Sequence, residues 1–388
     1  MRVAMIAPSH IPARRANTIQ VMKMAQAIAS LGHEVRLVSP VAGSSGADRS
    51  ISWEELSRHY GLKTHFGVEW LPVFSFMRRY DFGYRSVTWA RRWGAEIIYT
   101  RLPQTAAIAS QVGIPTILEA HDIPRGTLGP VMFKAFLRGH GARRLVVITR
   151  SLKEDLVQRL GAPSDPQFAV IEPDGVDLSR YADLPEIDLA RRTIQEKLNQ
   201  NLEGARFVAG YTGHFYPGRG VELVLEIAQR LPEMLFLLVG GEPQDVLRLQ
   251  EQIRLSGLMN VILSGFVPNA DLPFYQAACD ALLMPYQKQV AASSGGDIAR
   301  YLSPMKLFEY MACGRAILSS DLPVLQEILK TDFALLLPSA DVTRWVGALQ
   351  ELDSDPQMRS ELGQRARAAA KRYTWEARAQ RILEGLAG

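Results

Sequence analysis

The fold is decided at the start of the chain, in MRVAMIAPSHIPARRANTIQVMKMAQAIASLGHEVRLVSP (residues 1–40). Residues 3–7 form a short apolar run typical of a buried parallel strand, and residues 8–16 form a loop. Asn17 is a good N-cap for the helix that follows, and Gly32 ends that helix. Residues 34–38 supply a second strand, so the order predicts a βαβ opening.

The alternation of strands and helices continues to residue 171 and begins again at residue 207. The expected strands are residues 96–99, 115–118, 144–148, 168–171, 207–211, 235–239, 261–263, 281–284 and 316–318. Two separate sets of this kind predict an α/β fold with two Rossmann-like, doubly wound parallel sheets facing across a cleft. The polar, helix-prone stretch of residues 181–204 is where we expect the domain boundary.

Composition excludes several classes of protein. The 388 residues are 47% hydrophobic and 22% charged, which is typical of soluble globular proteins. No apolar run approaches the ~18 residues that a membrane span needs, and the N-terminal apolar stretch is too short for a secretory signal. We therefore expect a cytoplasmic protein. Two cysteines, Cys279 and Cys313, are too few for a disulfide framework or a four-ligand zinc site.

The net charge of +4 hides an asymmetry between the two halves of the chain. Residues 1–180 carry 23 Lys and Arg against 15 Asp and Glu, and residues 181–388 carry 21 against 25. The basic first half favours an anionic partner, which the charge alone leaves open among phosphate, nucleic acid and an anionic membrane surface.

The stretch around residues 295–320 has the composition of a phosphate site. A Gly-rich loop leads to Ser303 and Pro304, a good N-cap and N1 pair for a helix that starts near Met305. Lys306 is an unfavourable charge in the first turn unless an anion such as a diphosphate binds there. Glu309 lies on the same face and is suited to a ribose diol. The alternative is a surface helix with a Lys306–Glu309 pair.

A second loop, residues 213–220, joins a strand to a helix. Its glycines bracket Arg219, whose guanidinium is suited to bidentate contacts with phosphate oxygens. The order of residues is not that of a P-loop, so a phosphotransferase that uses Mg-ATP is not supported.

His121 follows an expected strand, with Asp122 beside it. This loop position indicates a functional histidine, and the alternative is a structural one. The sequence contains neither HExxH nor CxxC, so it gives no support to a metal site.

These motifs together resemble the GT-B glycosyltransferases, in particular the retaining enzymes of family 4. The resemblance covers nearly the whole chain and is carried by eight blocks: ANTIQVMKM (16–24), EAHD (119–122), VITRS (147–151), DGVD (174–177), YPGRG (216–220), GGE (240–242), GFVP (265–268) and SPMKLFEYMACG (303–314). The last block is the most specific.

The resemblance implies an enzyme that transfers a sugar from a nucleoside diphosphate to an acceptor hydroxyl, with retention and without a metal or other cofactor. Residues 1–180 would bind the acceptor, with a helix at about 373–388 crossing back to them, and residues 181–372 would bind the donor. The partners would be a nucleotide sugar and a glycan, lipid-linked or small-molecule acceptor in polysaccharide or glycoconjugate biosynthesis.

The resemblance also implies roles for individual residues. His121, Arg219 and Lys306 would be catalytic, His121 against the transferred sugar and the two cations at the diphosphate. The donor would be bound by Glu309, Ser303, Pro304, Asp297, His214, Gly213, Phe266, Val267 and Leu307. The acceptor side would include Arg14, Arg15, Asn17 and Asp122.

Two positions depart from the family pattern. Tyr301 stands where a glutamate often binds the donor sugar. Either Asp297 in the adjacent loop substitutes for it, or the donor sugar lacks the hydroxyl that is normally held. The first loop has Arg14 and Arg15 in place of a glycine pair. These departures leave open a catalytically silent relative that binds a glycan or nucleotide, and an epimerase or hydrolase on the same fold is a further alternative.

Residues 74–93 interleave arginines with Phe, Tyr and Trp. This composition allows peripheral contact with a membrane, at its inner face for a cytoplasmic protein, or a membrane-tethered scaffold. The interpretation that we favour is a partly buried helix with a solvated basic edge. Nucleic-acid binding has no motif in its favour.

Overall fold

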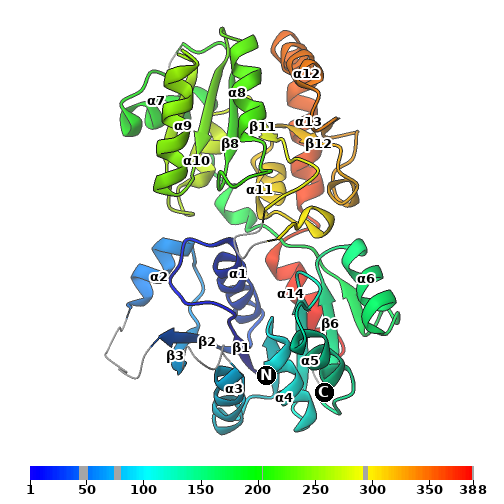
Figure 1. Ribbon diagram of the computed structural model, residues 1–388. Helices are drawn as coiled ribbons and strands as arrows, with labels where there is room; N and C mark the ends of the chain where they lie inside the picture. Colours follow the sequence, from blue (N-terminus) through cyan, green and yellow to red (C-terminus); the bar gives the residue numbers. More distant parts are fainter. Residues whose placement is uncertain (43–50, 74–79, 203, 292–295, 387–388) are drawn as a thin grey trace. The chain divides into compact units, whose positions relative to one another are not determined.

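The computed structural model describes residues 1–42, 51–73, 80–202, 204–291 and 296–386. They form two compact units, one of Met1–Asp174 with Trp375–Gly388 and one of Gly175–Thr374 (Figure 1). Each unit is built on one parallel sheet with helices packed on it, which confirms the predicted fold class.

The first unit contains a seven-stranded sheet in the order β3-β2-β1-β4-β5-β6-β7. Its strands are β1 (Arg2–Ile6), β2 (Glu34–Ala42), β3 (Gly67–Val73), β4 (Ile97–Thr100), β5 (Thr116–Ala120), β6 (Ala142–Val147) and β7 (Ala169–Ile171). Its helices are α1 (Ala16–Ser30), α2 (Trp53–Tyr60), α3 (Tyr80–Trp93), α4 (Pro103–Gln111), α5 (Leu128–Leu137), α6 (Arg150–Leu160) and α14 (Trp375–Leu383).

The second unit contains a six-stranded sheet in the order β10-β9-β8-β11-β12-β13. Its strands are β8 (Val208–Thr212), β9 (Leu235–Val239), β10 (Val261–Gly265), β11 (Ala281–Met284), β12 (Ala316–Ser320) and β13 (Leu335–Leu337). Its helices are α7 (Ile187–Leu198), α8 (Val221–Arg230), α9 (Pro243–Leu255), α10 (Leu272–Ala277), α11 (Met305–Cys313), α12 (Val342–Ser354) and α13 (Pro356–Ala370).

The central strands are buried along their length, which is why they are near-continuous apolar runs instead of alternating ones. In both sheets the strand order reverses once, between β1 and β4 and between β8 and β11. Ligands of doubly wound sheets bind beyond the carboxyl ends of the strands at this reversal. The loops that follow β1, β4, β8 and β11 are therefore the places to look for a site.

The chain returns to its first unit at the end. Helix α14, red in Figure 1, packs against α1 of that unit. Trp375 is buried in this contact region and is 2% exposed. The unit boundaries fall at 174/175 and 374/375, where we expected 180/181 and 372/373. The stretch 181–204, where we expected the boundary, contains α7, which packs on α10 inside the second unit.

Two expected helix caps are wrong. Helix α1 begins at Ala16 with Arg15 as N-cap, and Asn17 lies inside the first turn, where its Nδ2 donates to Ser9 Oγ over 2.7 Å. Helix α11 begins at Met305 as expected, but Pro304 is its N-cap instead of Ser303. Both N-caps have extended backbone angles and no side-chain cap, so loop geometry and not capping chemistry sets these two helix starts.

Part of the basic aromatic segment forms helix α3, and residues 74–79 lie outside the described residues. Phe82 and Ala90 of this helix are buried in the core, while Arg91 and Arg92 are exposed. The helix therefore has a buried face and a solvated basic edge. Among the described residues, no helix combines the length and the apolar character that a membrane span requires.

Candidate active site

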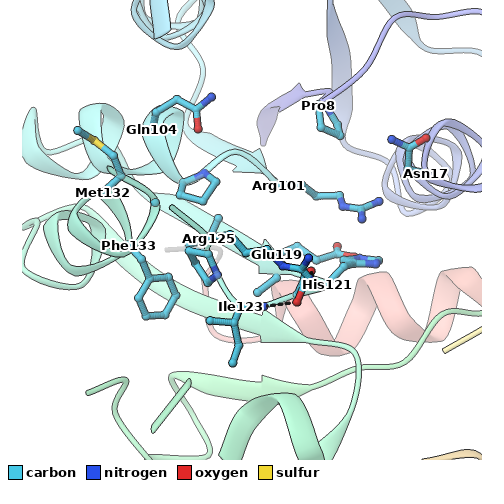
Figure 2. Close-up of a pocket in the computed structure, with 16 residues that line it drawn as sticks. Pro8, Asn17, Arg101, Gln104, Glu119, His121, Ile123, Arg125, Met132 and Phe133 are labelled. Carbon is cyan, nitrogen blue, oxygen red and sulfur yellow. Dashed lines mark hydrogen bonds and ion pairs between the residues drawn. The ribbon is translucent and has the colours of Figure 1, made fainter. Parts of the chain in front are cut away.

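The first unit contains a pocket of about 410 Å³ at the point where its strand order reverses (Figure 2). Four segments supply its walls: the loop after β1 with the start of α1, the loop after β4, the loop after β5, and the first turns of α5. The lining residues with polar side chains are Asn17, Arg101, Gln104, Glu119, His121, Asp122 and Arg125. The expected acceptor-side residues Asn17 and Asp122 thus lie in one pocket with His121, whereas Arg14 and Arg15 are exposed and do not line it.

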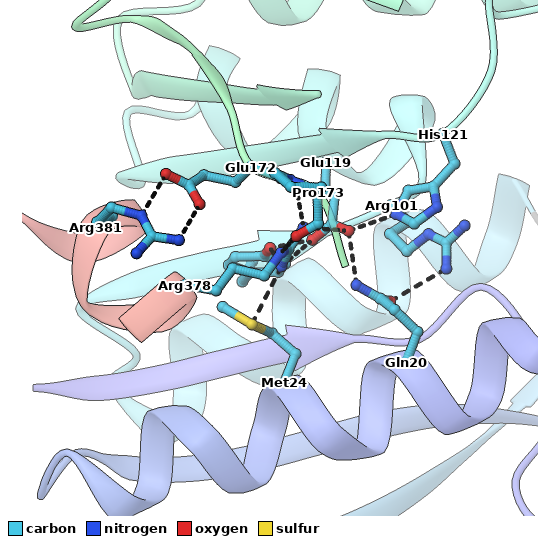
Figure 3. Close-up of polar contacts among 10 residues, drawn as sticks. Gln20, Met24, Arg101, Glu119, His121, Glu172, Pro173, Arg378 and Arg381 are labelled. Atoms are coloured by element: carbon cyan, nitrogen blue, oxygen red, sulfur yellow. Dashed lines mark hydrogen bonds and ion pairs between the residues drawn. The ribbon is translucent and has the colours of Figure 1, made fainter. Parts of the chain in front are cut away.

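Behind His121 lies a buried network of charges (Figure 3). The Glu119 carboxylate is 1% exposed and contacts the His121 Nε2 and the Tyr99 hydroxyl. It also accepts from Gln20 Nε2 over 2.7 Å and from Arg378 over 3.0 Å. Arg378 comes from α14, so the last helix of the chain supplies the counter-charge for a residue that ends a central strand.

This network sets the protonation states around the pocket. Burial alone would raise the pKa of Glu119, but the charge of Arg378, the hydrogen bond with His121 and the charge of Arg101 hold it well below its usual value. Burial and the charge of Arg101 lower the pKa of His121 to about 4. Burial raises the pKa of Asp174 to about 7. At neutral pH the site therefore holds an ionised Glu119 and a neutral His121.

Glu119, His121 and Asp174 each place one ligand atom within 4.8 Å of the others. A bound cation would have to share this space with Arg378, which already binds both oxygens of Glu119. Since that guanidinium neutralises the carboxylate, the three residues fit a metal ion poorly.

The second unit brings Lys306 and Arg219 together around two tyrosines. Lys306 Nζ lies 3.6 Å from the centre of the Tyr211 ring and 5.5 Å from that of Tyr286. The Arg219 guanidinium lies 5.4 Å from the Tyr286 ring, and its NH1 is 3.3 Å from the Tyr286 hydroxyl. The two cations therefore converge from α11 and from the loop after β8.

The environment of the Lys306 amino group disfavours its charged form. Its Nζ is buried and has no hydrogen-bond partner among the described residues. Burial, followed by the charge of Arg219, lowers the pKa of Lys306 well below its ordinary value, although Glu309 acts in the opposite direction. A buried ammonium without an acceptor is costly, and an anion bound beside it would offset that cost.

The loop that carries Arg219 can be built only with glycine. Gly218 and Gly220 both have φ of +82°, and a Cβ on either would lie within 2 Å of a backbone carbonyl oxygen, at Gln289 and Pro285 respectively. This close approach holds the loop against the segment after β11 and thereby fixes where Arg219 points. At the start of the loop, Gly213 lies against Lys306, whose Nζ would be 3.0 Å from an added Cβ.

Glu309 is buried at 8% exposure and lies 3.9 Å from Arg180 NH1. Arg180 also donates to the backbone oxygen of Asn269, in the segment that follows Phe266 and Val267. Phe266 is exposed and Val267 is buried. Glu309 and the loop after β10 are thus linked through one arginine.

The remaining expected donor residues have varied surroundings. The His214 ring stacks on Tyr216 at 4.7 Å, and its Nδ1 is 3.9 Å from Glu242. Asp297 is exposed, and its Oδ1 accepts from the amides of Val290 and Ala299 in its own loop. Leu307 is buried in the hydrophobic core, where it serves packing. Ser303 is half-buried.

Sequence reasoning missed Arg101 and Arg378. Arg101 directly follows β4, just as His121 directly follows β5. This position after a central strand is the signal by which Arg101 could have been found. Arg378 gave no signal, because it is 259 positions from Glu119.

Two family models match the chain, one in each half. The model described as Glycosyltransferase Family 4 matches residues 18–180, and the model described as Glycosyl transferases group 1 matches residues 193–369. The chain is a GT-B glycosyltransferase of the family 4 type.

This glycosyltransferase is similar to the phosphatidyl-myo-inositol mannosyltransferase of Mycolicibacterium smegmatis, with 24% identity over 100% of this chain and 95% of the relative. Its structure resembles that of Anabaena Alr3699/HepE in complex with UDP and glucose, with a TM-score of 0.74 and 19% identity over 100% of both chains. It also resembles a glycosyltransferase from Rickettsia africae, with a TM-score of 0.75 and 12% identity over 99% of both chains. At these identities the structural likeness establishes the fold alone.

Proposed function

We propose that this glycosyltransferase moves a sugar from a nucleoside diphosphate sugar to an acceptor hydroxyl, with retention of anomeric configuration. The observation that carries the proposal is the convergence of Lys306 and Arg219 at Tyr286, with the Lys306 Nζ buried and without a hydrogen-bond acceptor among the described residues. A diphosphate supplies the missing acceptor and the missing negative charge. The solved complex of Alr3699/HepE with UDP and glucose supports a nucleotide donor of this class.

The two cations would act on the leaving group. As the bond to the sugar breaks, negative charge grows on the diphosphate oxygens, and Lys306 and Arg219 are already in place to neutralise it. Fixed charges in a desolvated site stabilise a transition state without reorganisation, and removal of one such group costs about 10²–10³ in rate. Because these cations supply the positive charge, we propose that the reaction needs no metal or other cofactor.

Other residues would bind and orient the substrates. Glu309, buried beside Arg180, would accept hydrogen bonds from the ribose diol, and the backbone around Phe266 and Val267 would meet the base. In the first unit, the neutral imidazole of His121 would lie against the transferred sugar. The pocket that it lines would hold the acceptor.

The acceptor is proposed to be a glycan, a lipid-linked substrate or a small molecule. The mannosyltransferase relative is named for a phosphatidyl-myo-inositol acceptor, and another relative is named alpha-galactosylglucosyldiacylglycerol synthase. Such acceptors favour a cytoplasmic enzyme that works at the inner face of the membrane, with the exposed Arg91 and Arg92 of α3 as a contact. Sedimentation with anionic vesicles, compared between wild type and an Arg91→Glu/Arg92→Glu variant, tests that contact.

The proposal is tested by incubation with UDP-, GDP- and dTDP-sugars together with polyol and lipid acceptors, while release of nucleoside diphosphate is measured. Release that depends on an acceptor, persists with EDTA and gives a product with the donor's anomeric configuration is the expected result. Release without an acceptor indicates a hydrolase. Nucleotide binding without release for any donor and acceptor pair indicates a silent binding protein, and absence of nucleotide binding contradicts the proposal.

A further inference from the structure

Arg101 lines the pocket in the first unit. It directly follows β4, next to the reversal of strand order, and shares the pocket wall with His121 and Asn17 (Figure 2). Among the described residues, its guanidinium makes one hydrogen bond, from NH1 to Gln20 Oε1 over 3.2 Å, and no ion pair. The donors that remain are available to a ligand in the pocket.

The nearby carboxylate is already fully used. Glu119 accepts from or contacts Gln20, Tyr99, His121 and Arg378, so both of its oxygens are occupied by other groups. Gln20 joins the two centres, because its amide nitrogen donates to Glu119 and its oxygen accepts from Arg101. The amide thereby orients Arg101 without neutralising its charge.

The second arginine of the pocket differs in this respect. Arg125 is about half exposed and forms an ion pair with Asp122 at 2.7 Å. Its charge is balanced within the protein, whereas that of Arg101 is not. Arg101 is half-buried, and burial lowers its pKa in spite of the charges of Glu119 and Asp174.

We propose that Arg101 is an anion subsite for the acceptor, and that the acceptor of this enzyme carries a phosphoryl or carboxylate group bound by the Arg101 guanidinium. The planar fork of arginine matches both oxyanions in a bidentate manner. This inference rests on the proposed sugar transfer, since it names the class of acceptor for that reaction. The inference also predicts selectivity: a neutral acceptor leaves the Arg101 guanidinium unpaired and therefore binds weakly.

The test measures binding of glucose 6-phosphate, glucuronate, glucose and inorganic phosphate by calorimetry to wild type and to Arg101→Gln and Arg125→Gln variants. The two sugar anions are matched to glucose in ring shape, so they separate phosphate from carboxylate. We expect at least one anion to bind saturably and glucose not to bind. We expect Arg101→Gln to weaken the anion about tenfold or more and Arg125→Gln to weaken it less than threefold. Cosedimentation with phosphatidylinositol or phosphatidylcholine vesicles then separates a lipid headgroup from a free phosphate.

Thermal stability gives an independent readout. Because Arg101 is half-buried and forms no ion pair among the described residues, Arg101→Gln should raise the unfolding temperature of the first unit while it weakens anion binding. A merely structural arginine would lower that temperature. Equal anion binding by Arg101→Gln and wild type, or no binding of any anionic probe to wild type, overturns the proposal. UDP binding is measured on the same samples and should be unchanged in Arg101→Gln, so failure of wild type to bind UDP would contradict the sugar transfer separately.

Discussion

Replacement of Arg378 by Met should destabilise the first unit strongly. Arg378 is 1% exposed and donates to the Pro173 carbonyl over 2.8 Å, to the Glu172 carbonyl over 3.1 Å and to the Glu119 carboxylate over 3.0 Å. The variant leaves a buried carboxylate without its counter-ion. Removal of one partner of a buried ion pair costs about 3–5 kcal/mol. For a unit of this size, that loss lowers the unfolding temperature by about 6–20 °C.

The matched control is Arg381→Met on the same helix. Arg381 forms a bidentate pair with Glu172 at 2.8 Å, but its side chain is 43% exposed. An exposed pair of this kind contributes about 0–1 kcal/mol. The assay is calorimetric unfolding, with hydrogen exchange used to assign each transition to a unit.

The stability lost in the Arg378→Met variant should depend on pH and on Glu119. Without Arg378, burial dominates and raises the pKa of Glu119 in the folded state. A carboxyl group with a raised pKa stabilises the folded state at low pH, and this contribution is lost as the pH rises through that pKa. The difference in unfolding free energy between wild type and Arg378→Met should therefore grow from pH 5 to pH 8. The Glu119→Gln/Arg378→Met double variant should recover part of the loss. An Arg378→Met variant within about 1 kcal/mol of wild type, or a control that is equally damaged, would refute the reasoning.

Two further predictions concern a glycine and a buried acid. Gly218→Ala should lower the free energy of unfolding by more than the about 1–2 kcal/mol that a left-handed alanine costs, because its Cβ would lie 1.9 Å from the Gln289 backbone oxygen. The resulting shift of the loop that carries Arg219 should abolish UDP binding. Gly257→Ala, at φ +64° with open space around it, is the control and should cost only the backbone penalty while leaving UDP binding intact; denaturant unfolding and titration with UDP measure both. Asp174 has its pKa raised to about 7, so it contributes stability at acidic pH that is lost between about pH 4 and pH 7. Asp174→Asn should remove that loss in thermal unfolding across this range, and an unchanged pH profile would contradict the assigned protonation.

The alternation of elements could be predicted from the sequence because each buried parallel strand is an apolar run that ends at a polar loop. The bounds of β9 and β11 agree with the residues expected. The edge strands β3 and β13 were missed. β3 has seven residues, but all of them are half-buried, so it is not the buried apolar run that marks the central strands. β13 is half-buried too and has only three residues, which is too short to stand out in sequence.

The parts of the site that lie within short, recognisable segments could be predicted from the sequence. Lys306, Glu309 and Arg219 lie in loop and helix starts whose composition indicates an anion site, and the structure brings Lys306 and Arg219 together. The network around Glu119 could not be predicted, because its parts come from distant segments. Gln20 and Arg378 reach Glu119 only through tertiary packing of α1 and α14.

The central claim is that Lys306 and Arg219 receive a diphosphate, and proton uptake on UDP binding tests it most directly. The pKa of Lys306 is well below its ordinary value in the free protein, and a bound diphosphate should raise it again. Calorimetric titration with UDP at pH 8, in buffers of different ionisation enthalpy, should therefore show proton uptake by wild type. Lys306→Met should show none and should bind UDP about tenfold or more weakly. Equal affinity and equal proton uptake in the two proteins would contradict the account.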